Sequence, residues 1–442
     1  MSQVPINLNT TNITENGARF TWEYVDGYGD LFVFEVQTTG TDDTFTIPTT
    51  GAGYDCEVLW GDGSDWEAFS GTAPAISHQY ADEDLYEIRI RGDFPRIYFN
   101  YTGHRDKMVS IKHWGSQKWT SMERAFEGCR YMNVVAEDDP DLSLASTILR
   151  MFHGCEHNLD FSANHWDVSN ISNISWAFRY TREFNSNLGN WDTSEVTDMS
   201  YMFNMAYKFN NGGSDSIGNW DVSKVKNMHN MFAESQFNQD ISEWNTASLE
   251  NLQGTFMCVF NQNINTKLVN EGTPEEYTAW DTSNVTNMSY TFKNNSAFKQ
   301  DISGWNFEKV TTFVEFLNVA NINATGTTTN YDKLLISIAS QNVNNSLSFH
   351  GGTSKYSDGD GEPDKTTNAE FARWSLIAVH DSALADEEGT DKSTYDDEAV
   401  GFQFWDTSAE RIWIKRTAGS ADWIGPFNLG KSWTITDGGL AT

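Results

Sequence analysis

A repeat of about 25 residues runs through the middle of the chain and constrains its fold more than any other feature. Its clearest marker is a tryptophan followed by Asp or Asn, which occurs at Trp166, Trp191, Trp220, Trp244, Trp280 and Trp305. A phenylalanine recurs in a second register, at Phe126, Phe152, Phe178, Phe203, Phe232, Phe256, Phe292 and Phe316. One unit of this size cannot bury both rows of aromatic side chains, so we expect neighbouring units to stack on each other.

Each unit combines two kinds of apolar spacing. The Val-x-x-Met-x-x-Met-Phe stretch has nearly helical spacing, whereas the following Phe-Asn-x-x-Ile-x-x-Trp stretch is short and flanked by polar residues, as a strand with a tight turn is. The pattern predicts one short helix and one strand per unit. Longer spacings mark two insertions, near residues 212–216 and at 266–277, and we expect the second to project as a loop.

Asparagine occupies a fixed place in several units. Asn185, Asn210, Asn238 and Asn261 each follow a phenylalanine. A side-chain amide in such a place can hydrogen-bond to the turn backbone or to the same residue one unit away. We therefore interpret these asparagines as structural.

The repeated motifs W-D-x-S-x-V-x-x-M-x-x-M-F and F-N-x-x-I resemble the BspA-like leucine-rich repeats of bacterial surface proteins, which phage-encoded proteins also contain. The resemblance covers roughly residues 119–317, with several residue types in register over many units. It implies a mixed α/β repeat solenoid of the leucine-rich-repeat type, flanked by all-β modules. It also implies binding and adhesion more than catalysis.

Five segments are expected along the chain. Residues 1–30 are polar, and we expect an N-terminal arm or attachment segment there. Residues 31–105 have the alternating pattern of a small β-sandwich, whose Trp60-Gly-Asp-Gly-Ser-Asp65 turn and following His78-Gln-Tyr resemble PKD-like domains. The repeat solenoid is expected at 106–330. Its cap, which resembles the terminal cap of BspA-like repeats, is expected at 331–380 and 431–442, interrupted by an inserted small β module at 381–430.

The charge of the chain argues against two classes of partner. The formal net charge of −33 repels nucleic-acid backbones and anionic lipid, and no window of the sequence forms a basic stripe. No run of 18 apolar residues occurs, and no basic stretch followed by an apolar core follows Met1. We therefore expect no nucleic-acid partner, no membrane span and no export signal.

Motifs for catalysis are missing from the sequence. It has no G-x-S-x-G elbow, P-loop, H-E-x-x-H or dinucleotide fingerprint. Acidic runs such as residues 137–141 would fit a glycosidase carboxylate pair, but a chain of this charge carries such clusters on surface loops by chance. The chain is therefore predicted not to be an enzyme, with a glycan depolymerase on a viral spike as an alternative.

Two clusters have the residue types of metal ligands. His153, Cys155 and His157 suit zinc, but Cys155 lies in the same repeat position as Cys129, which favours a small core residue. The carboxylates of Asp358, Asp360, Glu362 and Asp364 are spaced two apart, as in calcium loops, although Pro363 replaces the usual turn glycine. We keep these four as a candidate Ca²⁺ site, with a solvated acidic loop as the alternative, and expect no other cofactor.

Tyrosines in variable repeat positions are the candidate ligand-binding residues. Tyr side chains on a ridged surface stack on sugar faces or peptide side chains at low entropic cost. The candidates are Tyr180, Tyr201, Tyr207 and Tyr290. The alternative is that each tyrosine only shields the apolar rows beneath it.

Together these features favour a non-enzymatic virion structural protein of a bacteriophage, such as a tail or head fibre or a decoration protein. Its expected location is the virion surface, where it would contact other virion proteins and a glycan or protein receptor on the host. A homo-oligomer is a further candidate assembly. The alternative is an exported adhesin on a bacterial cell surface, which the lack of an export signal after Met1 disfavours.

Overall fold

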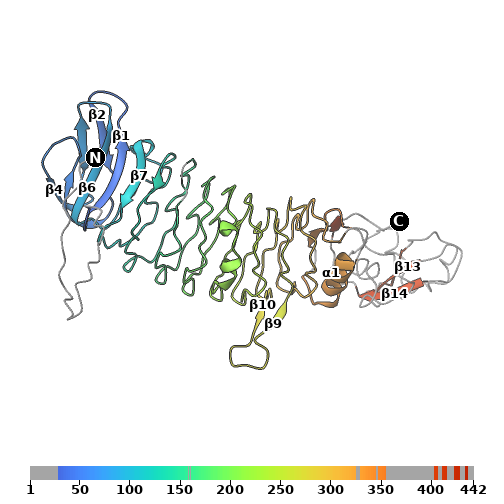
Figure 1. Ribbon diagram of the computed structural model, residues 1–442. Coiled ribbons are helices and arrows are strands. Elements are labelled where there is room, and N and C mark those ends of the chain that lie inside the picture. The colour runs from blue at the N-terminus through green and yellow to red at the C-terminus, as the bar shows by residue number, and fades with distance from the viewer. Residues whose placement is uncertain are drawn as a thin grey trace. The chain divides into compact units, whose positions relative to one another are not determined.

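The structure is a computed structural model that describes residues 28–157, 159, 161–324, 329–344 and 347–354, together with four later strands. The chain divides into two compact units, Met1–Asn170 and Ile171–Thr442. This boundary falls inside the range 106–330 that was expected to be one repeat domain. Figure 1 labels several elements of each unit.

A six-stranded sheet dominates the first unit, in the order β4-β3-β6-β1-β7-β8. The strands and their partners are β1 (Phe32–Gln37), β3 (Ala52–Leu59), β4 (Glu67–Thr72), β6 (Leu85–Asp93), β7 (Met108–His113) and β8 (Asn133–Val134). A separate antiparallel pair consists of β2 (Asp43–Ile47) and β5 (Ile76–Tyr80), and a short 3-10 helix, η1 (Arg105–Lys107), precedes β7. The sheet therefore continues past residue 105, where the β-sandwich was expected to end.

The first repeat turns continue the hydrogen bonding of this sheet. β7 pairs in parallel with β8, and Lys118 forms an isolated parallel bridge with Asp141. The backbone N–H of Phe99 donates to the carbonyl of Ala125 at 3.2 Å, so the segment after β6 also docks on a turn. Strands and repeat turns share one hydrogen-bonded body in this unit.

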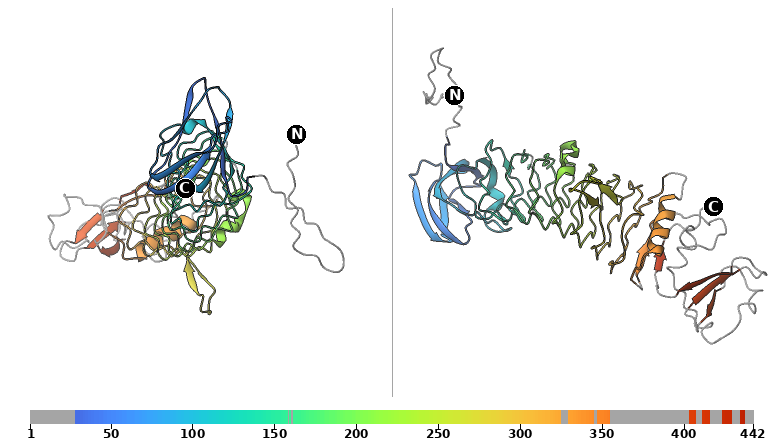
Figure 2. Two further views of the ribbon diagram at one scale, coloured as in Figure 1. Left: turned by 90° about the vertical axis from the view of Figure 1, so that its left-hand side faces the viewer. Right: turned by 90° about the horizontal axis from the view of Figure 1, so that it is seen from below.

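Repeat turns in the second unit stack through backbone hydrogen bonds, which include one isolated β-bridge per turn (Figures 1 and 2). The bridges are parallel and join successive members of one column: Asn173, Asp198, Asn227, Asn251, Asn287 and Thr312. A single bridge is too short to make a strand, so regular strands do not form along this column. Further backbone hydrogen bonds join the same turns, such as Tyr201 N–H to the carbonyl of His229 at 2.7 Å and Phe203 N–H to that of Met231 at 2.9 Å. Backbone bonds and interior side chains therefore both hold neighbouring turns together.

Three columns of stacked aromatic rings fill the interior of these turns. Ring centroids of successive tryptophans lie 6.0–6.5 Å apart along Trp191, Trp220, Trp244, Trp280 and Trp305. One phenylalanine column contains Phe178, Phe203, Phe232, Phe256 and Phe292, and the other contains Phe184, Phe209, Phe237, Phe260 and Phe298. All but Trp191 and Trp220, at 3% exposure, are at most 1% exposed, so burial of these columns stabilises the stack of turns.

The predicted helix in each unit is wrong, because the segment forms two consecutive β-turns. Met202 N–H donates to the carbonyl of Met199 at 3.3 Å, and Tyr201 between them has a φ of 57°, as the third residue of a type II turn requires. A second turn follows at once, in which Ala206 N–H donates to the carbonyl of Phe203 at 3.0 Å. Two such turns bury residues at i, i+3, i+4 and i+7, which is the spacing of a helix face.

The predicted fold class, a mixed α/β solenoid of the leucine-rich-repeat type, is therefore wrong. Across the described residues the only α-helix is α1 (Thr329–Ser340), which follows the repeat turns, and the remaining elements are strands, turns and short 3-10 helices. The predicted strand in each unit is also missing, because each turn contributes one isolated bridge instead. Among its described residues, the second unit is built from stacked turns, with β-strands in an insertion and near its C-terminal end.

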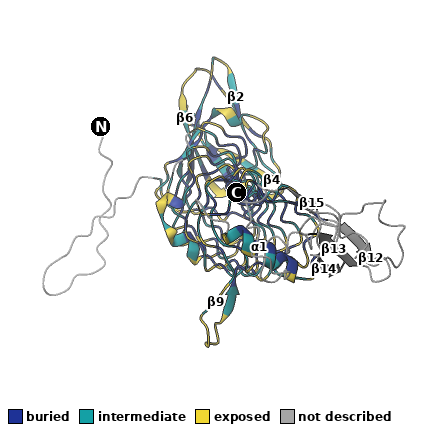
Figure 3. Ribbon diagram, turned by 90° about the vertical axis from the view of Figure 1, so that its right-hand side faces the viewer, coloured by how far each residue is buried: buried dark blue, intermediate teal, exposed yellow. Residues whose placement is uncertain are grey.

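Both insertions form small elements of their own. The first contains two short 3-10 helices, η2 (Asn211–Gly213) and η3 (Asp215–Asn219). The second forms a hairpin of β9 (Lys267–Val269) and β10 (Tyr277–Ala279), which projects from the turns in Figures 1 and 2. Its connecting loop is fully exposed in Figure 3, as expected for this insertion.

Further elements follow the repeat turns. The helix α1 buries Tyr331, Leu334, Leu335, Ile338 and Ala339 on one face. β11 (Ser348–His350) pairs in parallel with β15 (Thr434–Thr436), so the two segments assigned to the interrupted cap meet. Between them in sequence, β12 (Gln403–Asp406), β13 (Arg411–Lys415) and β14 (Trp423–Asn428) form an antiparallel sheet in that order.

Candidate functional site

The type II turns hold a recurring residue in the left-handed region. In the second unit this position is taken by Trp176, Tyr201, Asn230, Gly254, Tyr290 and Glu315, with φ between 49° and 62°. Left-handed backbone costs a residue with a Cβ about 1–2 kcal/mol, and glycine escapes that cost. Gly254 proves that the turn forms without a side chain. The bulky aromatic residues are therefore not required by the backbone of the turn.

Three of these turns bring aromatic side chains together. The Tyr201 ring lies 4.3 Å from the Trp176 ring and 4.6 Å from the His229 ring, centroid to centroid. The Tyr201 hydroxyl is 3.3 Å from His229 Nε2, within hydrogen-bonding distance. Burial lowers the pKa of His229, although Asp198 partly opposes this, so the imidazole is neutral at neutral pH.

Arg179 contacts three aromatic rings from two turns. Its guanidinium carbon lies 4.6 Å from the centroid of the Trp176 ring, 4.8 Å from that of Tyr180 and 5.8 Å from that of Tyr201. Its Nε donates a hydrogen bond of 2.8 Å to Asn204 Oδ1. Each cation–π contact at a partly exposed site contributes about 0.5–1 kcal/mol, so several together fix the side chain. The aromatic strip is defined here as Trp176, Arg179, Tyr180, Tyr201 and His229.

The structure thus separates the four predicted tyrosines. Tyr180 and Tyr201 lie in the aromatic strip around Arg179. Tyr207 is 39% exposed and lies beneath Arg182, whose guanidinium carbon is 5.6 Å from the ring. Tyr290 lies under the ammonium of Lys293, at 4.8 Å. Trp176, Arg179 and His229 were not predicted. The sequence signal for two of them was their register, because Trp176 occupies the repeat position of Tyr201 and His229 directly precedes Asn230 in that position.

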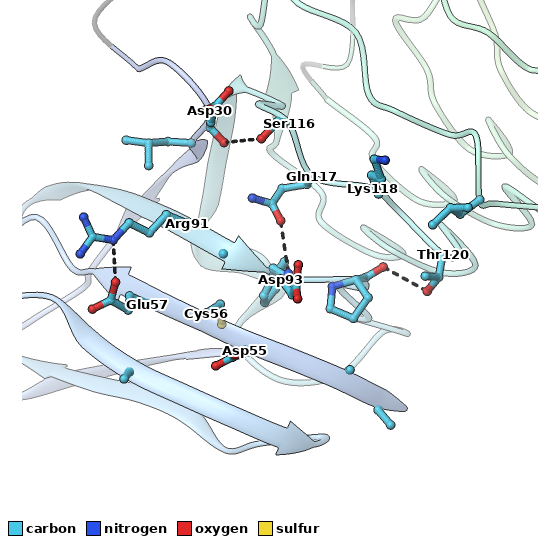
Figure 4. Close-up of a pocket in the computed structure, with 18 of the residues that line it drawn as sticks. Asp30, Asp55, Cys56, Glu57, Arg91, Asp93, Ser116, Gln117, Lys118 and Thr120 are labelled. Carbon is cyan, nitrogen blue, oxygen red and sulfur yellow. Dashed lines mark hydrogen bonds and ion pairs between the residues drawn. The ribbon is translucent and has the colours of Figure 1, made fainter.

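A large pocket of about 1280 Å³ lies in the first unit. Two of its polar lining residues already have hydrogen-bond partners. Arg91 Nε donates to Glu57 at 2.7 Å, and Gln117 Oε1 accepts from the N–H of Phe94 at 3.2 Å (Figure 4). Cys56 lines the pocket, but burial raises the pKa of its thiol to about 11. A protonated thiol is a poor nucleophile, so this pocket has no reactive centre of that kind.

No metal centre emerges within the described part of the chain. No group of three or more His, Cys, Asp or Glu side chains there is arranged to hold an ion. Burial strongly raises the pKa of the Cys155 thiol, and His153 Nδ1 lies 2.9 Å from the buried carboxylate of Glu127, so neither side chain is set up as a zinc ligand. The candidate calcium ligands Asp358, Asp360, Glu362 and Asp364 lie outside the described residues.

The acidic run at residues 137–141 contains one carboxylate that is bonded to backbone. Asp138 accepts hydrogen bonds from the backbone N–H groups of Trp114 and Gly115 at 2.9 and 2.8 Å, so it has a structural role. Glu137 and Asp139 are both exposed. Among the described helices, none combines the length and the apolar character needed to cross a membrane.

Comparison with known proteins places the repeat turns in a family. A family described as "Mycoplasma protein of unknown function, DUF285" matches residues 120–215, 146–268 and 271–356. No curated protein and no solved structure matches the chain. The family match is compatible with a BspA-like surface protein, whereas it lends no support to a phage origin or to a PKD-like domain. Because the matched stretches together cover more than half of the sequence, the chain belongs to the DUF285 family.

Proposed function

We propose that the chain is a non-enzymatic surface protein that recognises a glycan or protein receptor through the aromatic strip. The observation that carries the proposal is the occupancy of left-handed positions by Trp176, Tyr180 and Tyr201. Each of these side chains occupies a backbone position that favours glycine and is only partly buried. The aromatic surface they create is therefore better explained by binding than by folding.

The composition of the strip suits a receptor with both apolar and polar faces. Ring faces of Trp and Tyr give contact area at low entropic cost, and the guanidinium of Arg179 adds hydrogen-bond donors. Arg179 is already oriented by Asn204 and by three rings, so little side-chain freedom is lost on binding. A preorganised strip of this kind binds a surface without any catalytic group.

Two carriers fit this function. The resemblance to phage-encoded repeat proteins favours a virion appendage attached to other virion proteins, with several copies adding avidity. The DUF285 description names a mycoplasma, which favours an adhesin on a cell surface instead. Immunogold microscopy with antibody to the repeat turns separates them. Gold on virus particles supports the appendage, and gold on uninfected cells supports the adhesin.

The binding proposal is tested with the fluorescently labelled full chain on intact cells from the source culture. Tyr201→Ala and Arg179→Ala are expected to weaken cell binding by about tenfold or more, the size of effect seen for central aromatic and Arg residues. Tyr131→Ala is the matched control, because Tyr131 is 50% exposed and lies outside the strip. Equal binding by all four proteins, with unchanged circular dichroism, would contradict the proposal.

A further inference from the structure

A smaller pocket, of about 360 Å³, lies in the first unit where the tryptophan pattern of the repeat begins. Asp141-Leu142-Ser143 occupies the same repeat position as Asp167-Val168-Ser169, and the backbone N–H of each serine donates to the aspartate side chain at 3.0 Å. In this register Pro140 stands where the next unit has Trp166. The turn with Pro140 therefore supplies no indole to cover Trp166.

The indole N–H of Trp166 is unpaired among the described residues. In four later turns the equivalent Nε1 donates to a backbone carbonyl of a preceding turn: Trp220 to Leu188, Trp244 to Ile217, Trp280 to Ile241 and Trp305 to Ile264, at 2.8–3.1 Å. Trp166 is only 3% exposed and lines the small pocket, yet it makes no such bond. Its Nε1 is not among the buried side-chain atoms that lack a partner, so water reaches this N–H in the pocket and a ligand oxygen can replace that water.

Aromatic rings make up the apolar wall of this pocket. The Trp166 ring lies 5.7 Å from that of Trp114, edge to face, and 5.4 Å from that of Phe161. Val134, Val135 and Ala136 complete the apolar lining. A volume of this size lies within the range of roughly 300–1,000 Å³ that is typical of small-ligand sites.

The rim of the pocket is acidic. Glu137, Asp139 and His165 line it and are exposed, while the carboxylate of Asp138 is occupied by the backbone of Trp114 and Gly115. Burial raises the pKa of Asp139, although His165 opposes this. Ionised Glu137 and Asp139 accept hydrogen bonds but do not donate them.

These features together define the ligand. It has to accept a hydrogen bond from an indole N–H, donate hydrogen bonds to carboxylates and lay an apolar face on aromatic rings. A neutral sugar ring meets all three demands, because its hydroxyl groups both donate and accept. A simple ammonium ion has no acceptor for the indole N–H of Trp166. An anionic sugar is repelled by the rim carboxylates and by the net charge of −33 on the chain.

We propose that the pocket formed by Trp114, Phe161 and Trp166 with the rim residues Glu137 and Asp139 binds a neutral pyranose unit of a polysaccharide. This site is distinct from the aromatic strip, and its existence does not depend on the strip being functional. A single ring held by few hydrogen bonds is expected to bind with roughly millimolar affinity.

The test is saturation-transfer NMR on the full chain with methyl glucoside and methyl galactoside, and with choline and glucuronate as charged probes. Saturable transfer to a neutral glycoside is expected. Trp166→Phe keeps the ring and removes the N–H, and it should weaken sugar binding by about tenfold. Asp139→Ala should weaken it by a similar factor, and each effect is measured as the change in Kd.

Matched controls separate binding from folding and from the proposed receptor site. Trp220→Phe removes an indole N–H that is already bonded to Leu188, so it should leave sugar affinity unchanged. Tyr201→Ala should also leave it unchanged, whatever its effect on cell binding. The proposal is overturned if neither glycoside binds, if only choline binds, or if Trp166→Phe and Trp220→Phe have the same effect on sugar affinity.

Discussion

Removal of one asparagine side chain tests how the repeat turns are held together. Asn238 Oδ1 accepts the backbone N–H of Asn261 in the next turn at 2.8 Å and the side-chain amide of Gln262 at 3.2 Å. The same bond recurs from Asn210 N–H to Asn185 and from Asn238 N–H to Asn210. The interpretation of these asparagines as structural is thereby confirmed, and each one caps a backbone donor of the following turn.

Asn238→Ala is expected to destabilise the second unit by about 1–3 kcal/mol, because the N–H of the half-buried Asn261 loses its acceptor. Asn238→Asp keeps a side-chain oxygen in the same place and should retain most of that stability. Stacked turns can unfold in parts, and the loss of one hydrogen bond is clearest at the amide that made it. Hydrogen exchange of the Asn261 amide reports the local bond directly, and 1.4 kcal/mol corresponds to about tenfold faster exchange.

The matched control is Gln236→Ala, since Gln236 is exposed and lies near Asn238 in sequence. Faster exchange at Asn261 in Asn238→Ala, with near-normal exchange in Asn238→Asp and Gln236→Ala, is the expected pattern. The reasoning is refuted if Asn238→Ala and Asn238→Asp accelerate exchange equally, or if neither changes it. Equal acceleration would mean that side-chain packing, and not the acceptor oxygen, protects the turn.

Two further predictions concern single residues. Gly254→Ala should destabilise the second unit by about 1–2 kcal/mol or more in thermal unfolding, since its φ is 62° and a Cβ would lie 1.9 Å from Asn230 Oδ1; Gly272→Ala, with open space around it, should cost less. The hydrogen bond from Lys107 lowers the pKa of Asp43 from 3.8 to about 2. The ionised Asp43 carboxylate therefore stabilises the folded state fully above about pH 4, and this contribution is lost as the pH falls towards 2. Asp43→Asn should flatten that part of an acid-unfolding curve, and an unchanged curve would contradict the assignment.

The period of the repeat and its stacking were predictable, because identical aromatic residues recur at nearly constant spacing. The conformation within each unit was not. Met199, Met202 and Phe203 are spaced as on a helix, yet two type II turns bury the same positions. The turns differ from a helix in the residue that is held at positive φ. Tyr201 in that position does not predict a turn, because tyrosine seldom adopts a positive φ. Gly254 and Asn230, in the same position of other units, hint at the turn, because both residue types adopt positive φ more readily.

The candidate site was predictable only in part for a related reason. Tyr180 and Tyr201 were found because they vary between units, but the contacts of Arg179 with rings from two turns depend on how far one turn is shifted against the next. The unpaired N–H of Trp166 depends on the bonds made by its counterparts. These contacts form between neighbouring turns, so the residue pattern within one unit does not predict them.

The bridges, asparagine bonds and aromatic columns all run between equivalent positions of neighbouring turns, and this has a consequence for how the chain can change over generations. Duplication or loss of one whole unit recreates every such contact, whereas an insertion that shifts the register interrupts all three aromatic columns at once. Two insertions, η2 with η3 and the β9–β10 hairpin, leave the flanking tryptophan rings stacked, Trp191 on Trp220 and Trp244 on Trp280. Recombination can therefore change the number of repeat units while the contacts between neighbouring turns are kept.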